Sequence, residues 1–345
     1  MTDELLLETA ERVFADTCTP AALDAAERDG WATGVWDAAA AVGLPWISVP
    51  ESSGGAGGTL GDALAVLRVA GRHGAPIPLA ETGVLGAWLL ASAGLPVGES
   101  PMTVVPGRSD DSVRRSGSTL TGVAHRVPWA RSVARVVMLV DGMVAAVPVV
   151  DLRVDAVANL AGEPRDTVTF DAVEVEELAP APAGIDAAAL RARGALTRVM
   201  LVAGALERVS EVTAGYARQR IQFGTPIARF QAVQALLVQG AEDAALVQMA
   251  AETAARAAER GPATFEIAAA KTLADAAALS AARVAHQAHG AIGVTREYLL
   301  HHYTRRLWAW RAEHASREWT EGIGRDVVAA GADRLYPTVA GGLPA

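Results

Sequence analysis

The sequence predicts an α+β protein in which a helical segment, a β segment and a long helical bundle follow one another along 345 residues. Three observations predict this class. Residues 1–101 place apolar side chains at helical spacing between Gly- and Pro-rich loops. Residues 102–184 change to short β-branched runs bounded by Gly, Asp or Pro, and residues 185–345 return to helical spacing over long Ala-rich stretches. We therefore expect an N-terminal helical domain, a middle antiparallel β domain and a C-terminal four-helix bundle.

The first two segments differ in the period of their apolar residues. Residues 3–14 carry Leu6, Leu7, Ala10 and Val13 on one helical face, and further helices are expected around Trp31 and Trp36 and after Leu60. In the middle segment the runs are too short for helices and are spaced like the strands of an antiparallel barrel or sandwich. The expected strands cover residues 118–129, 134–140, 143–150, 152–159 and 166–177.

The third segment predicts long helices that pack closely. Small residues lie on several faces of each helix, which allows close approach and indicates that more than one face is buried. A four-helix bundle that also oligomerises is the simplest interpretation. The expected helices cover residues 185–218, 228–258, 265–293 and 297–331, with a break in the last one near Ala315.

Composition excludes several classes of function. The formal net charge of −9 argues against nucleic acid or an anionic membrane as the main partner. A single cysteine, Cys18, allows neither an intrachain disulfide nor a cysteine metal cluster, and no metal site is predicted. No apolar run is long enough to cross a membrane, and the acidic, amphipathic N-terminus is not a signal peptide. A reducing cytoplasm is the expected location.

One stretch, YARQRIQFGTPIARFQAVQ (216–234), concentrates unusual side chains around a helix break. Gly224 and Pro226 interrupt the helical pattern, and Arg218 and Arg220 precede them. In one interpretation the arginines complement a helix C-terminus and Phe223 packs locally. In the other, the turn holds a ligand that is anionic and flat.

Four segments, in order along the chain, resemble the acyl-CoA dehydrogenase family. The stretch at 218–234 resembles that family's signature turn, with an arginine, FG, PI and FQ at the same spacing. HQAHGAIGVTREYLLHHYTRRL resembles its second signature, a helix ending in Q-x-x-G-G-x-G that is followed by T-E-Y and an arginine. The remaining two segments resemble the N-terminal P-E-x-x-G-G-x-G region and the strand whose tryptophan sits against the flavin; they cover residues 43–67 and 122–130.

The resemblance implies FAD as cofactor and assigns contacts to it. Arg220 would reach the pyrophosphate of an FAD held mainly by a neighbouring subunit, for which a planar, permanently charged guanidinium is suited. Phe223 would pack on the adenine or ribose, and Trp129 would flank the isoalloxazine ring. Amides and close backbone approach would come from Gln222, Gln231, Gln287 and Gly290, together with Gly293, while Ala291 replaces the family's second glycine.

The chain departs from the family pattern in the middle segment. Family members carry T-E-P-x-A-G-S-D there, which contacts flavin and thioester. The corresponding residues 104–117 keep only Pro106, Gly107, Ser109 and Asp110. We therefore expect a weaker local contribution of this segment to flavin binding.

The second departure concerns the catalytic base. The family's reaction removes a proton α to the thioester, for which a carboxylate must reach that hydrogen. The usual position of this glutamate holds His314, with Glu313 one residue earlier. A second family position aligns with Ala276, with Asp275 beside it. Because one residue along a helix rotates a side chain by roughly 100°, neither neighbour is an automatic substitute.

The predicted function is α,β-desaturation of an acyl-CoA thioester by an FAD-dependent dehydrogenase. The predicted partners are an acyl-CoA, an electron-transfer flavoprotein and further subunits in a homo- or hetero-oligomer, a dimer or tetramer. The chain resembles the base-poor subunits of short actinobacterial steroid-catabolic heterotetramers; alternatively Glu313 moves into place and the chain works alone. Two other classes remain open: a non-catalytic, flavin-supporting assembly subunit, and a relative with different chemistry, either a flavin oxygenase or a cofactor-free lyase.

Overall fold

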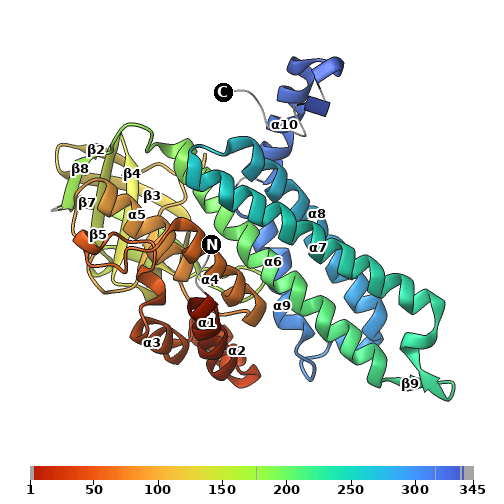
Figure 1. Ribbon diagram of the computed structural model, residues 1–345. Coiled ribbons are helices and arrows are strands. Elements are labelled where there is room, and N and C mark those ends of the chain that lie inside the picture. Colours follow the sequence, from red (N-terminus) through yellow and green to blue (C-terminus); the bar gives the residue numbers. More distant parts are fainter. Residues whose placement is uncertain (1–3, 176, 315, 335, 338–345) are drawn as a thin grey trace. The chain divides into compact units, whose positions relative to one another are not determined.

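A computed structural model describes residues 4–175, 177–314, 316–334 and 336–337. Figure 1 shows that helices come first, strands second and long helices last, which confirms the predicted α+β class. The chain forms two compact units, residues 1–70 with 75–197, and residues 71–74 with 198–345. Their boundary falls inside the long helix α6, so the three-domain boundaries expected from the sequence stay a prediction.

Among the helices of the first unit, α2 begins and ends at clear local signals. Thr19 caps α2 by accepting a hydrogen bond from the Ala22 N–H at 3.2 Å, and Pro20 occupies the first helical position. Gly30, at φ 90°, ends the same helix in the left-handed conformation. The helices are α1 (Glu4–Thr17), α2 (Pro20–Asp29), α3 (Thr33–Ala41), α4 (Leu60–His73), η3 (Ala80–Ala87) and α5 (Trp88–Ser92).

The segment η3 is a π-helix, where the sequence predicts only an ordinary helix. All eight of its residues are buried. A Cβ on Gly83 would lie 1.9 Å from the Pro45 carbonyl oxygen, so the wide turn brings backbone against backbone. The Val84 carbonyl accepts a hydrogen bond from Arg193 Nε at 2.6 Å. The Arg193 guanidinium also lies 4.5 Å from the Trp88 ring, and burial lowers the pKa of Arg193 to about 10.

The strands form two four-stranded sheets, with orders β1-β4-β5-β8 and β2-β3-β7-β6. The named strands pair antiparallel, as the sequence predicts, apart from the short edge strand β1, which runs parallel to β4. Asp141 and Gly142 form the tight turn between β4 and β5, both with positive φ. The strands are β1 (Met102–Val104), β2 (Arg114–Ser116), β3 (Thr119–Pro128), β4 (Arg135–Val140), β5 (Met143–Pro148), β6 (Arg153–Asp155), β7 (Arg165–Glu174) and β8 (Glu177–Pro180).

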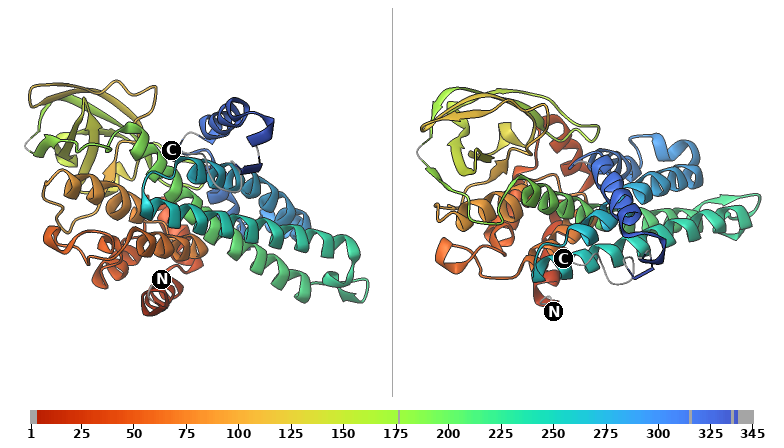
Figure 2. Two further views of the ribbon diagram at one scale, coloured as in Figure 1. Left: turned by 45° about the horizontal axis from the view of Figure 1, so that its top comes forward. Right: turned by 90° about the horizontal axis from the view of Figure 1, so that it is seen from above.

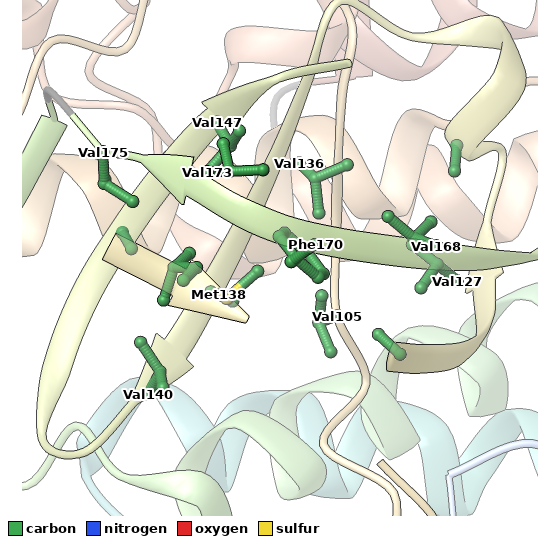
Figure 3. Packing of buried hydrophobic residues seen from close by; sticks show 14 residues of the cluster. Val105, Val127, Val136, Met138, Val140, Val147, Val168, Phe170, Val173 and Val175 are labelled. Carbon is green, nitrogen blue, oxygen red and sulfur yellow. The ribbon is translucent and has the colours of Figure 1, made fainter. Parts of the chain in front are cut away.

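The two sheets pack face to face around an apolar core, as in a sandwich (Figure 3). On β4, Val136 and Met138 point into this core, while Val137 points to the opposite face and packs with Leu89 and Leu90 of α5. This alternation with period two explains why β4 and β5 are apolar on both faces. The sheet β1-β4-β5-β8 therefore lies between the other sheet and the helices of its own unit.

The second unit is built from long helices. Figures 1 and 2 show α6, α7 and α8 running side by side, with a small hairpin at the turn between α6 and α7. The predicted break in the last helix is confirmed, since α9 and α10 are separate, although Ala315 itself lies outside the described residues. The helices are α6 (Ala187–Gln219), α7 (Gln231–Arg260), α8 (Thr264–His289), α9 (Leu300–Arg311) and α10 (Ser316–Ala330).

Candidate functional site

The turn between α6 and α7 is a two-stranded hairpin, and not a simple helix break. β9 (Ile221–Gln222) pairs with β10 (Thr225–Pro226), and Phe223 and Gly224 form the two-residue turn with φ of 53° and 78°. Positive φ at both central residues matches the right-handed twist of a hairpin. Glycine adopts it freely, whereas a phenylalanine in this conformation is strained. We call residues 220–230 the arm.

The arm presents its functional groups to solvent. Arg220 is exposed, and no carboxylate in the described part of the chain forms a salt bridge with it. Phe223 is 94% exposed, and its ring meets the Phe230 ring edge-on, with centroids 6.0 Å apart. Gln222 and Gln231 are exposed as well. These four predicted cofactor residues therefore lie together on one protruding arm and at the start of α7.

The second predicted cofactor segment lies at the C-terminal end of α8. Gln287 and Gly290 are exposed, and a Cβ on Gly290 would meet nothing within 4 Å, so its backbone is open to a ligand. The chain then turns through the short 3₁₀ helix η7 (Gly290–Val294). Gly293 is buried in this turn, where a Cβ would lie 2.8 Å from His289 Cβ. Ala291 is exposed.

Aromatic contacts join these two segments at one end of the second unit. The Tyr216 ring, one turn before the arm, stacks on the His289 ring at 4.4 Å with an interplanar angle of 21°. Tyr216 also donates its hydroxyl hydrogen to the His289 carbonyl, at 3.3 Å. Residues that the sequence places more than 70 positions apart therefore meet beside the arm.

Trp129 belongs to the first unit and follows β3. It has φ 57° and is only 3% exposed, and its backbone N–H donates to the Pro164 carbonyl at 3.1 Å. The Arg165 guanidinium lies 5.8 Å from its ring centroid and pairs with Glu163 at 3.1 Å. The predicted flavin contact of Trp129 stays a prediction; a ligand would meet little of the ring's own surface.

The segment 104–117 runs from the end of β1 through a polar loop at residues 106–112 into β2. Arg108 and Asp110 form a salt bridge at 2.8 Å, and the Arg108 side chain holds the pKa of Asp110 below its usual range. Asp111 accepts hydrogen bonds from the backbone N–H groups of Arg108 and His125, each at 2.7 Å. The acidic side chains of this loop are thus engaged within the loop and by the neighbouring strand.

Glu313, the candidate base, is paired with a buried cation. Arg198 Nε donates to Glu313 Oε2 at 2.6 Å, with the two side chains 2% and 18% exposed. A charge-assisted bond of this length stabilises the ionised carboxylate and directs it toward α6. The Glu313 carboxylate is partly exposed, but it is held in a salt bridge with Arg198.

A second buried ion pair lies close to the same loop. Lys271 Nζ contacts both carboxylate oxygens of Asp275, at 2.6 and 2.7 Å, and donates to the Arg311 carbonyl at 3.0 Å. Three acceptors match the three donors of the ammonium group. Burial lowers the pKa of Lys271, and the Asp275 carboxylate offsets part of that shift. Arg198, Glu313, Lys271 and Asp275 form what we call the ionic cluster.

The two usual base positions of the family lie beside this cluster. Ala276 is exposed on α8 and carries only a methyl group. His314 is half-buried with φ 54°, and its carbonyl accepts a hydrogen bond from Trp319 Nε1 at 2.7 Å. A non-glycine residue at positive φ is strained, and such strain often occurs at functional sites.

The sequence did not indicate the contacts that Arg198, Lys271, Tyr216 and His289 make close to the predicted site residues. One signal was available: Lys271 is the only lysine of the chain, and Asp275 follows four residues later on the same helical face. Arg198 and the aromatic residues carry no comparable local signal, because their partners come from distant helices.

Comparison with known proteins identifies the family. The model described as acyl-CoA dehydrogenase, N-terminal domain, matches residues 2–96, and the model described as acyl-CoA dehydrogenase, C-terminal domain, matches residues 188–312. The acyl-CoA dehydrogenase FadE28 of Mycobacterium tuberculosis is 30% identical over 295 residues, which cover 78% of this chain and 84% of that protein. The acyl-CoA dehydrogenase IpdE2 of the same organism is 29% identical over 324 residues, which cover 88% and 90%.

Solved structures agree with these sequence matches. The ChsE4-ChsE5 complex from Mycobacterium tuberculosis aligns with a TM-score of 0.87 at 24% identity, covering 96% of this chain and 99% of that chain. A structure described as the Tcur3481-Tcur3483 steroid ACAD G363A variant aligns with a TM-score of 0.80 at 26% identity, covering 95% and 98%. In the described part of the chain, no helix is long and apolar enough to span a membrane. The chain belongs to the acyl-CoA dehydrogenase family.

Proposed function

We propose that this protein is an FAD-dependent acyl-CoA dehydrogenase subunit that desaturates a bulky acyl-CoA thioester between its α and β carbons. The observation that carries the proposal is the arm, an exposed Arg220 and Phe223 beside the open Gln287–Gly290 turn, in a chain of this family. The similarity to a protein described as a steroid ACAD supports a steroid-derived acyl group as substrate. An electron-transfer flavoprotein is the proposed electron acceptor.

The residues of the arm fit the chemistry of a dinucleotide. An exposed guanidinium without a carboxylate partner can neutralise a pyrophosphate, and its planar fork matches two phosphate oxygens. Phe223 offers an exposed flat face, and its ring meets Phe230 edge-on. The amides of Gln222 and Gln287 can donate and accept hydrogen bonds with a ribose or adenine. When bound, FAD accepts the hydride that leaves the substrate's β carbon.

The remaining step, removal of the α proton, needs a free carboxylate. In this chain the Glu313 carboxylate is held by Arg198 at 2.6 Å, and Asp275 is held by Lys271. An ion-paired carboxylate is a weaker base than a free one, because protonation forfeits the pairing energy. We therefore propose that a related partner chain supplies the base.

An oligomer is also supported by the surface of α7. Val238, Leu246 and Met249 are exposed and fall within about 80° of one another around the helix axis. An apolar stripe of this kind on a long helix is the usual mark of a helix–helix interface. Changing Met249→Glu should reduce the mass of the complex measured by light scattering; an unchanged mass would count against this face.

The flavin role of the arm is tested with a matched pair of variants. Arg220→Ala should remove most of the bound flavin from the purified protein, measured by its visible absorbance against protein concentration. Arg218→Ala, which changes another exposed arginine two residues earlier, should keep it. Equal flavin content in both variants would contradict the role proposed for Arg220.

The source of the base is tested in the complex with the partner chain. A Glu313→Gln variant in this chain should leave acyl-CoA turnover largely intact when the partner provides the base. Loss of turnover, with flavin content and melting temperature retained, would instead favour the second candidate, in which Glu313 leaves Arg198 and acts as base. The partly exposed position of Glu313 is the observation that supports this alternative.

A further inference from the structure

Three aromatic rings form a compact cluster beside the arm. The Tyr216 and His289 rings stack at 4.4 Å, and Tyr298 lies 5.0 Å from His289 and 5.8 Å from Tyr216, at steep angles to both. The three residues come from the end of α6, the end of α8 and the loop before α9. Edge-to-face and offset contacts of this kind add specific geometry to plain apolar burial. We call Tyr216, His289 and Tyr298 the aromatic clamp.

The central histidine of the clamp has one defined orientation. His289 is buried, and its Nδ1 lies 2.8 Å from the Ala285 carbonyl oxygen, an acceptor. Nδ1 therefore carries the proton, and the neutral ring has its lone pair on Nε2. That lone pair is buried and has no partner among the described residues. The ring is thus held by stacking and by one hydrogen bond.

The clamp reaches both cofactor segments through the backbone. The Tyr216 carbonyl accepts the Arg220 N–H at 2.8 Å, where α6 ends and the arm begins. The Tyr216 hydroxyl donates to the carbonyl of His289, the residue directly before Gly290. Gly293 brings the η7 turn close to the same residue, since a Cβ there would lie 2.8 Å from His289 Cβ.

The arm itself has few contacts of its own. Its hairpin pairs only two residues with two, and its residues are exposed or half-buried. Such a short hairpin is not stable by itself in water. The direction in which Arg220 leaves the bundle must therefore be determined mainly where the arm joins it.

We propose that the aromatic clamp positions the Arg220 arm against the Gly290 turn, so that both segments can contact one ligand at the same time. The inference rests on the proposed flavin binding for its functional consequence. None of the three clamp residues needs to touch the cofactor. Their role is to hold two separate binding segments at a constant spacing, which raises affinity because less ordering remains to be done on binding.

The experiment compares clamp variants with a buried tyrosine elsewhere in the same unit. Tyr216→Leu removes the stack and the hydrogen bond, and Tyr216→Phe removes only the hydrogen bond. Tyr303→Leu is the control, because Tyr303 is buried on α9 and lies against Gly74. All are made in the full chain, with the partner chain present where the complex requires it. The readouts are hydrogen exchange at the amides of residues 220–222, the FAD dissociation constant and the melting temperature.

Tyr216→Leu should speed exchange in the arm and weaken FAD binding about tenfold, and Tyr216→Phe only about two- to threefold. Tyr303→Leu should lower the melting temperature without either effect. Equal arm exchange in the Tyr216 and Tyr303 variants would overturn the inference. If Tyr216→Leu does not fold, Tyr298→Leu at the edge of the clamp takes its place, with the same outcomes expected.

The two proposals fail in different ways. If the unmodified protein binds no FAD in any assembly, the proposed function fails, while the exchange data still decide whether the clamp holds the arm. If FAD binds normally to the unmodified protein and equally well to Tyr216→Leu, the positioning role is wrong and the proposed function stands.

Discussion

The two ends of α8 stabilise their surroundings by opposite means. Near its start, Lys271 and Asp275 belong to the ionic cluster, where buried charges are paired at 2.6 Å. At its end, His289 belongs to the aromatic clamp, where its ring stacks on Tyr216 and meets Tyr298 at a tilt. The two sites are 18 residues apart on one helix, or roughly 27 Å. The charges of the ionic cluster are buried and paired with one another. The aromatic clamp, in contrast, lies beside an arm that is exposed to solvent.

The difference separates two roles within one helical unit. A buried ion pair resists change, because removing one partner leaves an uncompensated charge in a low-dielectric interior. An aromatic stack tolerates small adjustments and leaves the neighbouring backbone free to receive a ligand. Under the proposed function, removal of the substrate proton takes place near the ionic cluster and cofactor binding takes place near the aromatic clamp. This chain therefore retains an open end suited to binding, while its acids at the other end are engaged.

The strongest test of the comparison is Lys271→Met. It removes the ammonium group from the buried Asp275 carboxylate and should cost about 3–5 kcal/mol of unfolding free energy. The matched control is Arg317→Ala on α10, where Arg317 and Glu321 also pair at 2.6 Å and four residues apart but are exposed. That change should cost no more than ~0.5 kcal/mol. Urea denaturation measures both, and similar losses would show that the burial of the ionic cluster contributes nothing special.

The neutral end is tested by Gly293→Ala. The added methyl would lie 2.8 Å from His289 Cβ and 3.3 Å from Leu300 Cδ2, so the turn must shift. We expect a loss of about 1–3 kcal/mol together with weaker flavin retention. Gly322→Ala on α10 is the control, since its methyl would meet open space and should stabilise the helix by up to ~1 kcal/mol. Unaltered stability in Gly293→Ala would mean that the turn does not rest on the clamp.

The two ends should also differ in their response to acid. Burial lowers the pKa values of His286 and His289 below their ordinary value of 6.5. As the pH falls below 6.5, the unfolded chain takes up protons that the folded chain does not, so stability decreases. His289→Phe keeps a ring in the stack and should reduce the loss of melting temperature between pH 7 and pH 5, by an expected shift of about one to a few degrees. An identical pH dependence of the melting temperature in the variant would show that His289 does not contribute to the loss of stability in acid.

The smallest expected change is Phe223→Gly at the tip of the arm. Relief of the positive φ and the greater freedom of glycine in the unfolded chain oppose each other, so stability should change by less than about 1 kcal/mol. Flavin affinity should fall, because the exposed ring is lost. Asp141→Gly, at φ 49° in the β4–β5 turn, is the control and should leave the flavin unaffected. Equal flavin affinity in the two variants would argue against a contact of Phe223 with the cofactor.

Much of the fold could be predicted because it depends on local period. The apolar spacing of residues 185–218 predicts α6 almost to its ends, and the β-branched runs predict β3, β4, β5 and β7. The hairpin of the arm could not be predicted, since a phenylalanine at positive φ is not a turn residue by its own preference. The π-helix η3 could not be predicted either, because its wide turn depends on the close approach of Pro45 to Gly83.

The candidate site likewise combines features that local sequence predicts with features that depend on distant contacts. Arg220, Phe223 and Gln287 were predicted from short motifs, and the structure brings their segments to one end of the bundle. The ionic cluster and the aromatic clamp depend on contacts such as Arg198 with Glu313, 115 positions apart. A single sequence does not contain that distance information. The sequence shows which residue types are present, but it does not show which of them come into contact in the folded chain.

Lys271 has a further practical consequence. It carries the only side-chain amine of the chain, it is 1% exposed, and its three donors are occupied. Amine-reactive labels, acylating agents and lysine cross-linkers therefore have no side-chain target on the folded surface. The same residue becomes reactive as soon as the bundle opens. A single pulse of such a reagent, followed by mass measurement of the peptide around residue 271, would report the fraction of molecules in which this part of the protein has come apart.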